Sequence, residues 1–240
     1  MLMLIAITRS YGAFTNSIGM IFVEIPPVAG SSKIPESNQQ DRTARAAEIK
    51  NPSSFWIGIT EVTQAQWESI MQTNPSYHKG SNLPVEMVSW NSAVDFCKRL
   101  GARDGMNYRL PTEAEWCFAC DGGKELKPDD LREVAWTLDN ATNTMPVGLL
   151  NPNGFGLYDM HGNVAEWCSD DYPLIWTNAL IEDIRHPAKG GSVGYFRKDS
   201  VISARQLYCG RKMEYRNSLI GFRVICVKQL AGNRKINPYD

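Results

Sequence analysis

The sequence lacks long hydrophobic runs, an excess of charge of either sign, and a rich supply of histidine. No apolar stretch approaches the roughly 20 residues that a membrane-spanning helix needs, so we expect no membrane span. Lys and Arg number 25 against 26 Asp and Glu, which leaves a formal net charge of -1. This balance excludes a globally basic nucleic-acid-binding protein, and we expect no nucleic-acid partner. The three histidines are far apart and do not predict a histidine-rich metal site.

What the sequence does contain is enough apolar material for a substantial core. The chain has 240 residues, of which 43% are hydrophobic, enough for one large domain or two small ones. Patterns typical of helices come early and those typical of short strands come late, without the regular alternation of a parallel sheet. The order predicts an α+β fold with a small antiparallel sheet and much irregular structure.

Several segments carry their own start and stop signals. Residues 16–26 and FWIG at 55–58 are rich in strand-forming side chains, whereas residues 29–54 have the polar composition of a long loop. Helices are predicted after three capping residues: Thr63, Ser89 and Thr112. Gly101 is expected to end the second helix. The tryptophans in these and later motifs are expected in the core: Trp67, Trp90, Trp116 and Trp167.

The first residues, MLMLIAI, form a short apolar run with no basic residue before it. There are two alternatives. The first is a short strand or an irregular start of the chain, and the second is an unusual secretion signal. The second alternative would place the protein at the cell surface or outside the cell, and the first would place it in the cytoplasm.

The six cysteines do not form a pattern typical of a metal site or of a disulfide framework. Cys117 and Cys120 are close together within a predicted helix, but a zinc site needs a second close pair and the sequence offers none. We therefore expect mostly free, buried thiols.

The segment from Asn153 to Trp167 has the residue types of a calcium site. Asp159 and Glu166 are hard oxygen ligands seven residues apart, and Gly162 allows the backbone between them to turn so that its carbonyl groups face the same point. The alternative is an ordinary turn, in which Asp159 caps a helix and Glu166 forms a surface ion pair.

Eight short motifs stand in one order along the chain: EVTQAQW (61–67), NPSY (74–77), LPVEMVSWNSAVDFCKRL (83–100), YRLPTEAEW (108–116), PVG (146–148), NGFGLYDMHGNVAEW (153–167), KGGS (189–192) and GFRV (221–224). Together they resemble the formylglycine-generating-enzyme, or sulfatase-modifying-factor, family. The resemblance runs from about Asn16 to Val227, which implies an extension at residues 1–15, a domain at 16–228 and a tail at 229–240. It implies a C-type-lectin-like core, with a small twisted sheet, a few helices and many ordered loops.

The resemblance implies one structural calcium ion (Ca²⁺). Family enzymes hold calcium at the segment that matches YDMHGNVAEW. The matching ligands here are the side chains of Asp159 and Glu166 and the carbonyl oxygens of Gly162 and Val164.

The resemblance argues against the family's copper chemistry. Formylglycine-generating enzymes hold copper with two cysteines that follow the segment matching KGGS, because thiolates suit the soft Cu(I) ion. The matching positions here are Tyr195 and Ser200, and neither supplies a thiolate. We therefore expect no copper.

The segment 193–219 has the composition of a recognition surface. Aromatic and arginine side chains are dense there, as in protein interfaces. The alternative is a solvated basic loop that covers the sheet. The predicted ligand-binding residues are Tyr195, Phe196, Tyr208, Arg211 and Tyr215.

The same segment resembles the display region of variable proteins of diversity-generating retroelements. There the stretch from KGGS to IGFR presents ligand-contacting side chains on a rigid lectin-like body. In this chain Lys189 replaces the usual arginine and Val193 the usual tryptophan. We therefore expect a non-catalytic domain that binds a peptide or protein ligand. The rival is a divergent formylglycine-generating enzyme or another metal-dependent oxidoreductase that acts on protein cysteine.

Overall fold

The structure is a computed structural model, and it describes residues 12–27, 54–122, 128–173, 184–195 and 211–227. Residues 29–53 of the predicted loop at 29–54 and the apolar N-terminal run lie outside these residues. Among the described residues, no helix is long and apolar enough to cross a membrane.

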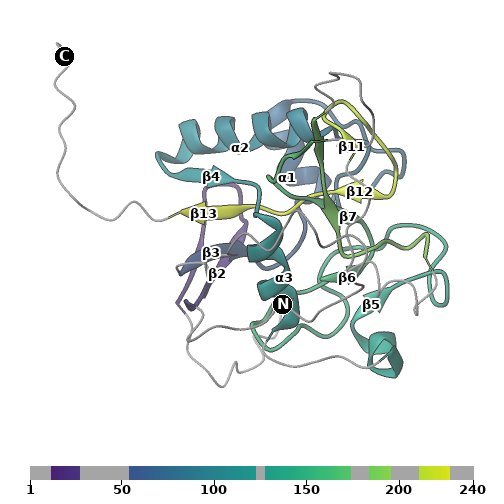
Figure 1. Ribbon diagram of the computed structural model, residues 1–240. Coiled ribbons are helices and arrows are strands. Elements are labelled where there is room, and N and C mark those ends of the chain that lie inside the picture. Colours follow the sequence, from purple (N-terminus) through teal and green to yellow (C-terminus); the bar gives the residue numbers. More distant parts are fainter. Residues whose placement is uncertain (1–11, 28–53, 123–127, 174–183, 196–210, 228–240) are drawn as a thin grey trace, which may run out of the picture.

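The main sheet is antiparallel and has five strands in the order β1-β2-β3-β13-β4. The strands are β1 (Ala13–Thr15), β2 (Ile21–Ile25), β3 (Phe55–Gly58), β4 (Asn107–Arg109) and β13 (Ile225–Val227). Strand β13, near the end of the described chain, lies between β3 and β4 (Figure 1). The sheet is therefore completed only when both ends of the domain come together.

Helices cover both faces of this sheet. Helices α1 (Gln64–Met71) and α2 (Trp90–Asp104) lie on one face, and α3 (Glu113–Asp121) lies on the other (Figure 1). Side chains alternate accordingly: Phe22 joins the core beneath α1 and α2, whereas its neighbour Val23 joins the core beneath α3. The α+β class is confirmed, with one antiparallel sheet between two separate apolar layers.

The predicted helix starts are confirmed. The Thr63 and Thr112 side chains each accept the amide of the residue three positions later, and Gln66 and Glu115 complete reciprocal capping boxes. The Ser89 side chain accepts the Ser92 amide before α2.

The predicted end of α2 at Gly101 is wrong. The helix continues to Asp104, and Gly105 ends it with a left-handed backbone at φ 66°. Gly101 is needed for another reason: a Cβ at this position would lie 2.8 Å from the Met106 carbonyl oxygen. The glycine allows the chain to fold back tightly against the helix on its way into β4.

The predicted strand at 16–26 is only partly correct. Its first half is a tight turn, because the Asn16 side chain accepts the amides of Ile18 and Met20, and Gly19 has φ 76°. The strand begins at Ile21, and β1 pairs with it from the other side of the turn.

The long region between α3 and β13 contains several short strands joined by ordered loops. A short 3-10 helix, η1 (Pro128–Glu133), begins it. Strand β7 (Ala165–Trp167) pairs with β10 (Ala188–Lys189) and with β12 (Ile220–Gly221). The remaining pairs join β5 (Ala135–Trp136) with β6 (His161–Gly162), and β9 (Ile184–His186) with β8 (Tyr172–Pro173) and β11 (Arg211–Lys212).

Three of the four tryptophans lie in the core as predicted: Trp67, Trp116 and Trp167 are 3%, 0% and 0% exposed. Trp90 is half-buried at the edge of the core, where its ring stacks on His186 with the centroids 3.7 Å apart. The five described cysteines are free thiols, and four are buried. Cys209 lies outside the described residues.

Candidate functional site

The loop from Asp159 to Glu166 has an unusual backbone. Asp159, Gly162 and Asn163 all have left-handed φ values, of 55°, 80° and 52°. Gly162 is required, because a Cβ there would lie 2.0 Å from the Trp136 carbonyl oxygen. The Asn163 amide donates to the same oxygen at 2.9 Å, so the loop is held tightly against β5.

Glu166 lies in the interior and pairs with Arg223, the arginine of the GFRV motif. Arg223 Nε donates to Glu166 Oε2 and Arg223 Nη2 donates to Glu166 Oε1, both at 2.7 Å. Trp116 Nε1 also donates to Oε2, at 2.6 Å. The alternative of a surface pair for Glu166 is thus wrong, because the carboxylate and the guanidinium are 1% and 0% exposed.

Arg223 also binds the backbone on both sides of the ion pair. Its Nη1 donates to the Gly58 carbonyl at 3.1 Å and its Nη2 to the Tyr158 carbonyl at 2.9 Å. Burial by itself lowers the pKa of Arg223, but the nearby carboxylates, Glu166 first, raise it above its ordinary value. The guanidinium therefore stays charged in the interior.

Asp159 is 2% exposed and only part of its carboxylate is used. The Gly148 amide donates to Oδ2 at 2.7 Å, while Oδ1 is buried and has no hydrogen-bond partner among the described residues. Burial raises the pKa of Asp159 to about 6, and Gly148 and Arg223 act in the opposite direction. Such a carboxylate is stabilised by a cation at Oδ1 or by a proton.

A third carboxylate, which the sequence reasoning missed, lies at the same loop. Glu61 is 0% exposed, and the Asn163 side chain donates to its Oε2 at 3.4 Å. Burial raises its pKa well above the ordinary value, and the charges of Asp159 and Glu166 raise it further. The available signal is its place in EVTQAQW, the first of the motifs that resemble the family, two residues before the capping residue Thr63.

The residues present are compatible with a calcium ion at this loop. Asp159 Oδ1 is a buried oxygen in need of a partner, and the three hydrogen bonds to Glu166 use three of roughly four acceptor positions. No three His, Cys, Asp or Glu side chains in the described ranges are placed to hold a metal by themselves. An ion here would therefore depend on backbone carbonyls as well, as the predicted set with Gly162 and Val164 requires.

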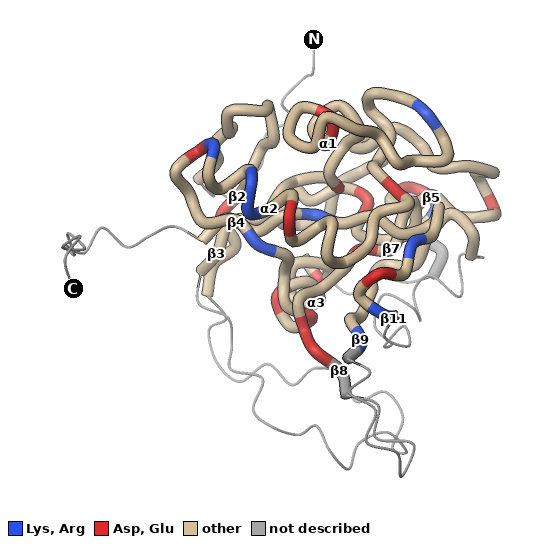
Figure 2. The backbone as a smooth tube through the Cα atoms, turned by 90° about the horizontal axis from the view of Figure 1, so that it is seen from above, with Lys and Arg blue, Asp and Glu red and all other residues tan. Residues whose placement is uncertain are grey.

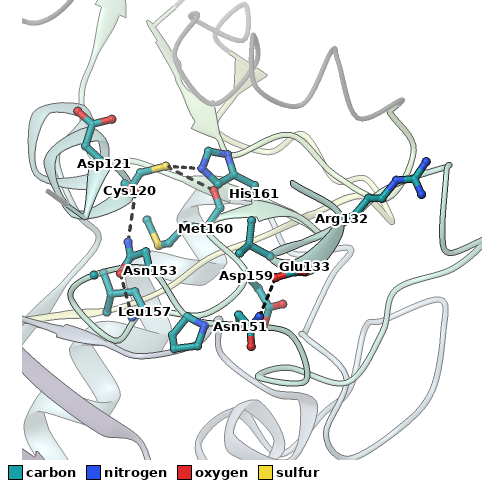
Figure 3. A pocket seen from close by; sticks show the side chains of 13 residues that line it. Cys120, Asp121, Arg132, Glu133, Asn151, Asn153, Leu157, Asp159, Met160 and His161 are labelled. Carbon is teal, nitrogen blue, oxygen red and sulfur yellow. Dashed lines mark hydrogen bonds between the residues drawn. The ribbon is translucent and has the colours of Figure 1, made fainter. Parts of the chain in front are cut away.

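A cavity of about 390 Å³ lies beside the loop, and Asp159 forms part of its wall (Figure 3). Cys120 and His161 meet at its edge, with Sγ and Nε2 3.4 Å apart. Burial raises the pKa of Cys120 well above its ordinary value, so this thiol stays protonated at neutral pH.

The predicted binding surface is described only in part. Phe196 and Tyr208 lie outside the described residues, as does Ser200. Tyr195 is half-buried, and its carbonyl accepts the Leu138 amide at 2.9 Å. Tyr215 is half-buried as well, and packs against the core beneath α2.

The remaining predicted binding residue, Arg211, lies on β11, where its backbone pairs with that of His186. The next pair in this register places Lys212 opposite Arg185, so two basic positions meet between β11 and β9. Figure 2 shows the basic positions of β9 and β11 side by side. The described residues do not include all five predicted binding residues, so the predicted surface stays a prediction.

The sequence matches the family described as the sulfatase-modifying factor enzyme 1-like domain over residues 19–228. The chain belongs to this family. A solved structure, the variable protein 1 of Treponema denticola, superposes with a TM-score of 0.71 at 25% identity, covering 91% of this chain and 99% of that one. The predicted family and the predicted C-type-lectin-like fold class are both confirmed.

Curated relatives in the family have different stated functions. The chaperone protein LppX of Paenibacillus barcinonensis is 30% identical over 217 residues, which cover 65% of this chain and 73% of the relative. The formylglycine-generating enzyme of Thermomonospora curvata is 29% identical over 224 residues, which cover 85% of this chain and 70% of the enzyme. Membership of the family therefore leaves the activity of this chain open.

Replacing Arg223 with Met should destabilise the protein strongly, because it leaves the Glu166 carboxylate buried without its cation. We expect a loss of about 3–5 kcal/mol in the free energy of unfolding, measured by urea titration. The matched control is Arg99→Met. Arg99 pairs with Asp95 on the surface of α2, with side chains 57% and 45% exposed, and should contribute no more than about 1 kcal/mol. Equal, small losses in both variants would contradict the structural role of Arg223.

Proposed function

We propose that this protein is a non-catalytic ligand-binding domain, which recognises a peptide or protein through the segment 193–219. The observation that carries the proposal is a body that matches the family, combined with an altered site. The chain matches the family over residues 19–228 and has a buried Arg223–Glu166–Trp116 network, but Tyr195 and Ser200 stand where the family enzymes have their copper cysteines. A domain that lacks the two copper-binding cysteines can still hold the segment 193–219 on a rigid scaffold, where it is accessible to a ligand.

The character of the segment favours a peptide or protein over a sugar. Arg211, Lys212 and Arg216 lie within six positions together with Tyr215. Large aromatic contact areas and directed arginine hydrogen bonds are features of protein interfaces. The likeness to the Treponema denticola variable protein supports the same interpretation.

A copper and oxygen assay tests the non-catalytic half of the proposal. The purified protein, incubated with Cu(I), should retain no stoichiometric copper and should consume no oxygen with a cysteine-containing sulfatase peptide. The double variant Tyr195→Cys with Ser200→Cys restores two thiolates and should gain Cu(I) binding. This variant shows whether the assay can detect a copper site on this body. Stoichiometric copper and peptide-dependent oxygen consumption by the unaltered protein would favour the oxidoreductase instead.

A selection from a random peptide library tests the binding half. Peptides selected on the unaltered protein should lose affinity for Arg211→Ala and Tyr215→Ala by tenfold or more, roughly the effect of removing one interface anchor. Lys98→Ala is the matched control, since Lys98 is exposed on α2 outside the segment. Peptides that bind all of these variants equally would place recognition elsewhere on the molecule.

We also propose that a structural calcium ion binds the loop from Asp159 to Glu166. The ligands would be the side chains of Asp159 and Glu166 and the carbonyl oxygens of Gly162 and Val164. The support is the unpartnered Asp159 Oδ1 and the left-handed backbone that turns the loop. When bound, the ion supplies positive charge to a buried cluster with an excess of carboxylates.

Chelation tests this proposal. An ion that binds only the folded state stabilises it, by about 2.7 kcal/mol at a calcium concentration 100 times the Kd. The melting temperature should therefore rise with added calcium and fall with EDTA, and Asp159→Ala should abolish the difference. A melting temperature that changes with neither calcium nor EDTA would contradict the calcium site.

A further inference from the structure

Glu61 is a fully buried carboxylate that the predicted calcium ligand set does not use. It lies between β3 and α1, and its side chain contacts Asn163 in the loop from Asp159 to Glu166. The Asn163 side chain donates to Oε2, and the Val164 backbone amide also stabilises the charged carboxylate. Its other oxygen, Oε1, is buried and finds no hydrogen-bond partner in the described part of the chain.

The cluster around Glu61 has more negative than positive charge. Three carboxylates, those of Glu61, Asp159 and Glu166, act on one guanidinium, Arg223, and on one another. Three negative charges and one positive charge leave two negative charges unbalanced. Since an unpaired buried charge is costly, the fully ionised cluster requires two positive charges from outside it. One divalent cation supplies that amount.

We propose that Glu61 is a positioning residue for the calcium site, and that it makes the site electrically neutral when the ion is bound. This inference rests on the calcium site proposed above. The described side chains do not place Glu61 as a direct ligand beside Asp159 and Glu166. It acts instead on the loop that carries the ligand carbonyls, where it accepts the Asn163 side chain and the Val164 backbone amide, and through its charge. Outer carboxylates of this kind orient metal ligands in many proteins.

The competing arrangement is a cluster that is neutralised by protons. In that arrangement a proton occupies the buried Glu61 Oε1, which has no hydrogen-bond partner among the described residues, and burial, which raises the pKa of Glu61, favours this state where no cation is present. If the protein always existed in that state, glutamine would mimic Glu61 closely and calcium would not depend on it. The substitution Glu61→Gln therefore separates the two arrangements, because it keeps the shape and removes the charge.

The experiment measures calcium affinity by isothermal titration calorimetry of the 240-residue protein. Glu61→Gln should weaken calcium binding about 10–100-fold, the usual cost of losing an outer-shell partner. Glu86→Gln is the matched control. Glu86 is also 0% exposed and also has one oxygen without a hydrogen-bond partner among the described residues. Its Oε1 instead accepts the His78 amide at 2.8 Å, so the control should leave calcium affinity unchanged.

Glu61→Asp keeps the charge and shortens the side chain, and covers the case in which Glu61→Gln does not fold. Glu61→Asp should bind calcium more tightly than Glu61→Gln, and should still bind calcium measurably if Glu61→Gln does not fold. If Glu61→Gln binds calcium as tightly as the unaltered protein, or if Glu86→Gln loses as much affinity as Glu61→Gln, the role proposed for Glu61 is wrong, while the calcium site itself is unaffected. An unaltered protein that binds no calcium would overturn the calcium site and this inference together.

Discussion

The ion pair between Arg223 and Glu166 is the interaction on which the domain depends most. The arginine lies just before the central strand β13, and the glutamate lies on β7, 57 residues earlier. From this position Arg223 also binds the Gly58 carbonyl at the end of β3 and the Tyr158 carbonyl in the loop region. Trp116 adds α3 through its hydrogen bond to Glu166. One buried guanidinium thus connects the main sheet, the helix beneath it and the irregular half of the domain.

The buried cluster around this ion pair contains more negative than positive charge. Glu61 and Asp159 add two more carboxylates within reach of the same cation, and each retains an oxygen without a hydrogen-bond partner among the described residues. The loop beside them has left-handed backbone at Asp159, Gly162 and Asn163. In the calcium site proposed above, a hard divalent cation would balance this charge and bind the unused Asp159 oxygen, and the stability of the body would then depend on the occupancy of one small site.

Local features were predictable from the sequence and distant pairings were not. The helix starts at Thr63, Ser89 and Thr112 follow from a side chain and an amide three residues apart. Gly101 was misinterpreted because a helix-ending glycine and a glycine required for a close backbone approach look the same in sequence. The same holds for the site. The sequence alone identifies Asp159 and Glu166 as candidate ligands by their carboxylates, whereas the roles of Arg223 and Glu61 depend on contacts that form only in the folded protein.

Anomalous diffraction from crystals grown in calcium would locate the ion relative to the buried cluster. We expect a peak at the loop, roughly 2.3–2.6 Å from the carboxylates of Asp159 and Glu166 and from the carbonyl oxygens of Gly162 and Val164, with the Arg223–Glu166 pair intact. A well-ordered loop with no anomalous peak, and with a hydrogen-bond partner other than an ion at Asp159 Oδ1, would contradict the calcium site.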